Sequence, residues 1–86
     1  MKIYKYVIPK FDSTIELPEN AQIKHVGIIQ NKVYIWALVS IHVPVIKRRF
    51  KVYCTGEEII EREYNHIGTY FINEGEFVCH VIEVIL

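Results

Sequence analysis

The most concentrated chemical feature of this sequence is the basic run Lys47–Lys51. Alternate side chains of an extended strand share one face, so Arg49, Lys51 and Tyr53 lie together. Arg48 lies on the opposite face. Because a guanidinium donates paired hydrogen bonds to phosphate and an aromatic ring offers a stacking surface, this strand predicts a site for a phosphate-bearing ligand. The alternative is a solvated outer strand whose charges protect a sheet edge.

The remaining polar residues give little support for catalysis or for a metal. The histidines show no HxH or HExxH spacing, so no metal site is predicted from His25, His42, His66 and His80. The chain holds one aspartate and two serines, and it lacks a nucleophile elbow, a P-loop and a GxGxxG motif. We therefore expect a non-enzymatic protein without a metal or a cofactor. His80, on an otherwise apolar strand face, is expected to be a hydrogen-bonded structural residue.

Two further groups of reactive side chains are interpreted as structural. Cys54 and Cys79 do not form a CxxC motif, and we expect two reduced core cysteines rather than a disulfide. The paired glutamates of Glu57–Asn65 lie in an acidic segment without a strand pattern, which is typical of a solvated loop.

Apolar and polar residues alternate along most of the chain, and stretches with helical spacing are missing. This pattern predicts about seven strands: Lys2–Ile8, Thr14–Leu17, Gln22–Gln30, Val33–Ser40, Arg48–Thr55, Ile67–Ile72 and Phe77–Leu86. Pro44 makes Ile41–Lys47 a loop, and Glu57–Asn65 is expected to be a loop or one helical turn. Asn31-Lys32 is predicted to connect a hairpin, since Asn tolerates the positive φ of such turns. We expect one all-β domain over residues 1–86, a small antiparallel barrel or sandwich.

Two of these strands are apolar on both faces, Val33–Val39 and Phe77–Leu86. An antiparallel sheet with one wet face should alternate apolar and polar side chains, and one small domain has one interior to offer. We therefore expect an identical subunit to cover the second faces and the protein to be a homo-oligomer. The alternative is that the loop Ile41–Lys47 or the segment Glu57–Asn65 folds over them. The predicted interface residues are Phe77, Val81 and Ile85.

Composition and charge narrow the function classes. The 86 residues carry ten basic and ten acidic side chains, and the pI of about 6.9 gives no electrostatic footprint for long nucleic acid. A hydrophobic fraction of 51% and a mean hydropathy of +0.17 exclude a disordered linker. No stretch has the length of a membrane span or the apolar region of a signal peptide, so we expect a cytoplasmic protein without a membrane partner.

Several short motifs in a fixed order resemble one known family. They are Met1-Lys2-Ile3-Tyr4-Lys5-Tyr6, Leu17-Pro18-x-x-Ala21, Trp36-Ala37-Leu38-Val39, Arg48-x-Phe50, Thr55-Gly56, Ile67-Gly68-Thr69 and Gly75-x-Phe77-Val78-x-His80-Val81-x-Glu83. The series is similar to that of a domain-of-unknown-function family of small phage and bacterial proteins. The resemblance implies a phage or prophage setting, in which very small non-enzymatic proteins often bind and block host components.

Together, the resemblance and the basic strand predict a phage-type binding protein that sequesters a small phosphorylated, nucleotide-type host immune signal. Arg49 and Lys51 would bind phosphate, and Thr55-Gly56 would let the backbone come close to the ligand. Tyr53 or Trp36 would stack on a base. The full predicted ligand-binding set is Arg48, Arg49, Lys51, Tyr53, Thr55, Gly56 and Trp36. The alternative function is a protein-interaction module whose apolar face or free strand edge docks on and inhibits a host protein.

Overall fold

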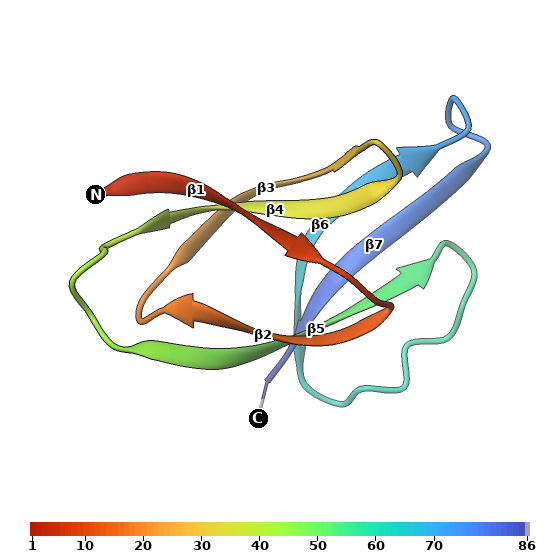
Figure 1. The fold of residues 1–86 in the computed structure, drawn as a ribbon. Helices are drawn as coiled ribbons and strands as arrows, with labels where there is room; N and C mark the ends of the chain where they lie inside the picture. Colours follow the sequence, from red (N-terminus) through yellow and green to blue (C-terminus); the bar gives the residue numbers. More distant parts are fainter. Residues whose placement is uncertain (86) are drawn as a thin grey trace.

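The computed structural model describes residues 1–85, which form seven strands in two antiparallel sheets (Figure 1). The strands are β1 (Lys2–Ile8), β2 (Asp12–Pro18), β3 (Gln22–Ile29), β4 (Lys32–Val39), β5 (Val45–Cys54), β6 (Tyr64–Ile72) and β7 (Phe77–Val84). Sheet A has the order β1-β4-β3, and sheet B has the order β2-β5-β7-β6. The sheets pack as two layers without closing into a barrel, so the fold is a β-sandwich. The described residues contain no helix long and apolar enough to cross a membrane.

All the predicted strands are present. The largest differences from the predicted bounds are that β5 and β6 begin earlier, so the loops before them are shorter than expected. β5 starts at Val45, directly after Pro44, because the first residues of β5 pair with β2. The predicted loop Ile41–Lys47 is therefore shorter than expected. β6 starts at Tyr64, and the connection before it contains no helical turn. β7 ends at Val84, and Leu86, the last residue of the predicted strand, lies outside the described residues.

The hairpin between β3 and β4 turns one residue earlier than expected. Gln30 and Asn31 have φ angles of 50° and 64°, the left-handed conformation of a type I′ connection. Asn31 thus adopts positive φ, as predicted. The resulting register turns Ile35, Ala37 and Val39 of β4 toward the interior, where all three are fully buried.

The core lies between the sheets and receives side chains from every strand. Its largest fully buried side chains include Phe50, Leu17, Ile35 and Val39. Val81 also lies in this core and is 0% exposed. It was predicted to belong to an interface between copies, but it has no exposed surface that a second copy could contact. Its inward position follows from the alternation of β7, which places it on the same face as buried Cys79. Phe77 and Ile85 lie near the two ends of β7 and are exposed.

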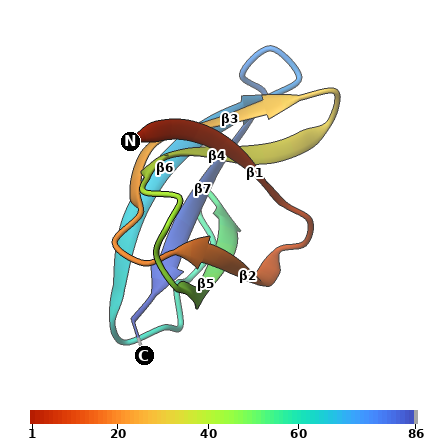
Figure 2. The same cartoon turned by 60° about the vertical axis from the view of Figure 1, so that its left-hand side comes forward.

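Along one side of the sandwich, β3 of sheet A packs against β6 of sheet B (Figures 1 and 2). A Cβ added to Gly68 of β6 would lie 2.7 Å from Val26 Cγ2 of β3, so this approach requires glycine. A bulge in the pairing of β6 with β7 falls just before it, between His66 and Gly68. The two sheets therefore come into close contact at this point.

Part of the outer face of sheet B, around the end of β7, is covered by the chain itself. Ile82 and Val84 of β7 face away from the core, yet Ile82 is fully buried and Val84 is 7% exposed. The connection between β5 and β6 reaches this face, because Glu61 of the connection binds Lys51 of β5 at 2.8 Å. Lys51 lies directly opposite Ile82 in the pairing of β5 with β7. At β7, the segment Glu57–Asn65 thus supplies the cover that was the alternative to a second copy.

Candidate functional site

The predicted ligand-binding set does not form one site. Arg48 lies on the inward face of β5, which also carries core residues, whereas Arg49 and Lys51 lie on the outward face. Trp36 belongs to β4 of sheet A, and Tyr53 belongs to β5 of sheet B. The alternation of β5 was predicted correctly, but the sheet order places Trp36, one of the two alternative stacking residues, in a different sheet from Arg49 and Lys51.

Arg48 is a structural clamp at one end of the sandwich. Its Nε and Nη2 donate to Glu83 Oε2 and Oε1 at 2.6 and 2.7 Å, and its Nη1 donates to the Ala21 carbonyl at 2.8 Å. The Arg48 and Glu83 side chains are 18% and 13% exposed. The hydrogen bonds to Glu83 raise the pKa of Arg48. This guanidinium joins β5 and β7 to the turn before β3, so it serves the fold.

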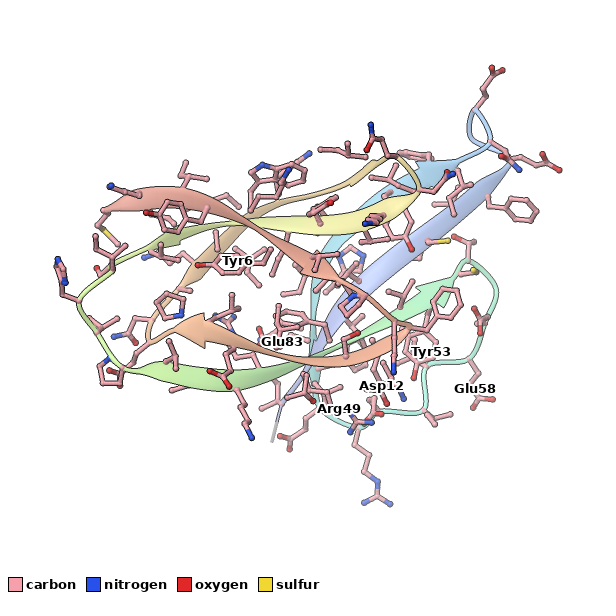
Figure 3. All side chains as sticks on the ribbon, in the orientation of Figure 1. Tyr6, Asp12, Arg49, Tyr53, Glu58 and Glu83 are labelled. Atoms are coloured by element: carbon pink, nitrogen blue, oxygen red, sulfur yellow. The ribbon has the colours of Figure 1, made fainter. Side chains whose placement is uncertain are left out.

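Arg49 and Lys51 are also paired with carboxylates. Arg49 donates to both carboxylate oxygens of Asp12, on the neighbouring strand β2, at 2.9 and 2.7 Å (Figure 3). This pairing lowers the pKa of Asp12 and raises that of Arg49. Lys51 donates to Glu61 at 2.8 Å, and this hydrogen bond raises the pKa of Lys51. A phosphate bound by these cations would have to displace a carboxylate from each.

Tyr53, Thr55 and Gly56 lie at the end of β5. Tyr53 is 8% exposed, and its hydroxyl has no hydrogen-bond partner among residues 1–85. Lys51 Nζ lies over the ring, 5.4 Å from the ring centroid. Thr55 is hydrogen-bonded to His80, and Gly56 has a φ of 97° in the turn that leaves β5. With so little exposed surface, the Tyr53 ring is not available for stacking on a base.

A polar network on the outer face of sheet B was not predicted. His66 Nε2 lies 3.1 Å from His80 Nδ1, and Thr69 Oγ1 lies 3.0 Å from the same nitrogen. Thr55 Oγ1 lies 2.9 Å from His80 Nε2, so His80 is hydrogen-bonded as expected. The bulge in β6 turns His66 onto the face of His80, and regular alternation gives no sign of it. The described part of the chain offers no group of three metal-ligating side chains here.

Cys54 and Cys79 face each other across β5 and β7. Both are free thiols, and their Sγ atoms lie 3.4 Å apart. The hydrogen bond to Cys79, together with burial, raises the pKa of Cys54 to about 11. Since the thiolate is the reactive form of cysteine, a thiol that stays protonated at neutral pH is a poor nucleophile. The pair is therefore structural, in line with the prediction of reduced core cysteines.

An apolar surface remains uncovered on the outer face of sheet A. We call it the Trp36 face, and its apolar residues are Ile3, Val7, Ile29, Tyr34, Trp36 and Leu38. Ile3, Val7 and Ile29 are 59%, 40% and 42% exposed. The outward positions of these strands also carry lysines and His25, but no carboxylate.

Trp36 lies on the central strand of this face, and its indole ring packs over Gly27 of the neighbouring strand. A Cβ added to Gly27, on the neighbouring strand β3, would lie 3.2 Å from Trp36 Cζ3. The His25 and Tyr34 rings lie 5.2 and 6.2 Å from the Trp36 ring, centroid to centroid. Lys5 Nζ of β1 lies 4.7 Å from the centroid of the Tyr34 ring. The result is an ordered aromatic platform that is half-buried within its own sheet.

Fold and site together define a small two-sheet β-sandwich in which Arg48, Arg49 and Lys51 are held in ion pairs and sheet A carries an exposed apolar outer face. Residues 1–85 match the family described as Domain of unknown function (DUF7352), and the chain belongs to this family. The expected kinship with a domain-of-unknown-function family is thereby confirmed. No curated protein and no solved structure gives a significant match.

Proposed function

We propose that this domain is a non-enzymatic binding protein that docks on another protein through the Trp36 face. The observation that supports this is an aromatic platform surrounded by exposed aliphatic side chains, among them Ile3 and Val7. Soluble monomers rarely leave such a patch in water unless it serves contact with a partner. Tryptophan and tyrosine also supply much of the binding energy at protein interfaces.

The charge of the Trp36 face indicates the kind of partner. Lys5 lies among its apolar residues, and no carboxylate occupies an outward position there. A second copy docked face to face would bring another lysine, whereas a partner with an acidic residue opposite Lys5 would complement it. The proposed occupant is therefore a protein surface that is apolar with an acidic residue in it.

The test compares two substitutions that add the same charge at exposed apolar positions. Ile3→Lys changes the Trp36 face, and Ile60→Lys changes a loop residue that is 72% exposed and lies elsewhere. A protein captured by the wild type is purified and mixed with each variant. We expect a stoichiometric complex with the wild type and with Ile60→Lys, at least tenfold weaker binding by Ile3→Lys, and a blue shift of Trp36 fluorescence in the complex.

Self-association is measured first, because the second copy that was expected to cover the outer side chains of Val33–Val39 would occupy the Trp36 face. We expect light scattering at micromolar concentration to give the mass of one chain. A dimer that Ile3→Lys dissociates would assign the face to a second copy instead. A partner that binds Ile3→Lys as well as the wild type, with unchanged Trp36 fluorescence, would overturn the proposal.

Sequestration of a small phosphorylated ligand is the weaker proposal, since Arg48, Arg49 and Lys51 already bind carboxylates. Calorimetric titration with cyclic dinucleotides and ADP-ribose derivatives is expected to release no heat. Saturable binding of one of these ligands that Arg49→Gln abolishes would favour ligand sequestration over docking on a protein. An origin in a phage or prophage and a role against host defence stay predictions.

A further inference from the structure

A pocket of about 670 Å³ opens between the sheets at the end that holds the β3–β4 turn. Its walls come from five strands and include Ile8, Ile28, Val33, Val52, Tyr70 and Ile72. The deepest of these are nearly inaccessible, since Ile8 and Tyr70 are each 4% exposed and Val52 is 8% exposed. The pocket is open to solvent at this end, and its volume and mostly apolar walls are those of small-molecule sites in proteins.

The rim of the pocket is fixed by the fold. The Val52 backbone N–H donates to the Phe11 carbonyl at 2.8 Å. The buried Ser13 hydroxyl accepts from the Lys10 N–H and donates to the Lys10 carbonyl, both at 2.9 Å. These bonds hold the connection between β1 and β2 in place beside the opening. The pocket is therefore preformed, which lowers the cost of binding.

The charges of the lining select a ligand class. Lys10 and Lys32 belong to the lining, and no carboxylate does. Within residues 1–85 neither lysine takes part in an ion pair, in contrast to Arg48, Arg49 and Lys51. An anion placed beside these lysines would gain charge-assisted hydrogen bonds without displacing a carboxylate.

We propose that this pocket binds an amphiphile with one aliphatic chain and an anionic head group, a carboxylate or a phosphate. The chain packs against the apolar walls between the sheets, and the head group lies beside Lys10 and Lys32. Val7 belongs to both the pocket lining and the Trp36 face, but the apolar walls named above lie between the sheets. The failure of one proposal therefore leaves the other standing.

The experiment titrates the full chain with octanoate, decanoate and dodecanoate, below their micelle concentrations, and follows backbone amides by NMR. We expect saturable binding with one ligand per chain and shifts centred on Val52 and Tyr70. Each added methylene should tighten binding about fourfold until the chain fills the pocket, after which the affinity levels off. Decyl phosphate is compared with decanoate, and the tighter of the two identifies the head group.

Two variants with the same change of charge per site separate a specific head-group contact from general attraction. Lys10→Glu with Lys32→Glu should weaken decanoate binding about three- to tenfold and leave decanol binding unchanged. Lys24→Glu changes an exposed lysine of β3 outside the lining and should leave both unchanged. The proposal is overturned by affinity that rises without levelling, by an equal loss in Lys24→Glu, or by shifts centred on Trp36 instead of the pocket.

Discussion

The hydroxyl of Tyr53 is the clearest energetic cost carried by a single residue. It is buried and has no hydrogen-bond partner among residues 1–85, and an unsatisfied buried polar group costs about 1–3 kcal/mol. We predict that Tyr53→Phe raises the free energy of unfolding by about 1 kcal/mol in urea titrations. Tyr64→Phe, at a tyrosine that is 40% exposed, is the matched control and should change little. A loss of stability in Tyr53→Phe would show that its hydroxyl is bound.

Tyr70 predicts how stability responds to alkaline pH. Burial, with a smaller effect of the nearby Cys79, raises the pKa of Tyr70 from 10.0 to about 12. Because the phenolate is favoured in the unfolded chain, stability is fully present below pH 10 and falls as the pH rises toward 12. Tyr70→Phe should flatten this decline in denaturant titrations at pH 9, 10, 11 and 12. An unchanged slope would mean that other groups, such as Cys54, cause it.

Among the contacts between strands, the Arg48–Glu83 pair is expected to contribute most as an ion pair, because it is the least exposed bidentate one. Glu83→Gln leaves the guanidinium largely buried without its counter-charge, and we predict a loss of about 2 kcal/mol in the free energy of unfolding. Glu76→Gln, in the exposed turn between β6 and β7, should be neutral. Equal effects of the two substitutions in urea titrations would contradict the clamp.

The approach of β3 to β6 predicts a coupling between Gly68 and Val26. Gly68→Ala places a methyl group 2.7 Å from Val26 Cγ2 and should cost about 1–3 kcal/mol of stability. In a Val26→Ala background the methyl group has room, so the same substitution should cost clearly less. A double-mutant cycle measures the difference, and strict additivity would contradict a direct clash.

The strands could be predicted from the sequence because alternation is a local property. The β5 faces of Arg48 and Arg49 and the positive φ of Asn31 follow from spacing and residue type alone. The sheet order could not be predicted, since it depends on which distant strands pair, and it separates Trp36 from Tyr53. The contact of His66 with His80 depends on a bulge in β6, where one extra residue shifts the alternation of the strand. The period-2 pattern of the sequence does not show where such a residue lies.

Apolar side chains on the outer faces of the two sheets are buried to different extents. On sheet B, Ile82 and Val84 of β7 are buried within one chain, and the connection between β5 and β6 reaches this face where Glu61 binds Lys51, beside Ile82. On sheet A, no comparable burial is seen at Ile3 or Val7. The sequence correctly indicated too many apolar faces for one interior, but period-2 patterns do not say which of them a loop will reach.

The position of β1 at the edge of sheet A has a consequence for solubility. An open edge invites further strands to add, and a charged side chain in its middle opposes stacking. Lys5 breaks the otherwise uncharged segment Ile3–Ile8, which is rich in aromatic and β-branched residues. We predict that Lys5→Thr forms fibrils detected by thioflavin T, whereas Lys24→Thr stays soluble. One ammonium group outside the core would then keep neighbouring copies from joining into a continuous cross-β stack.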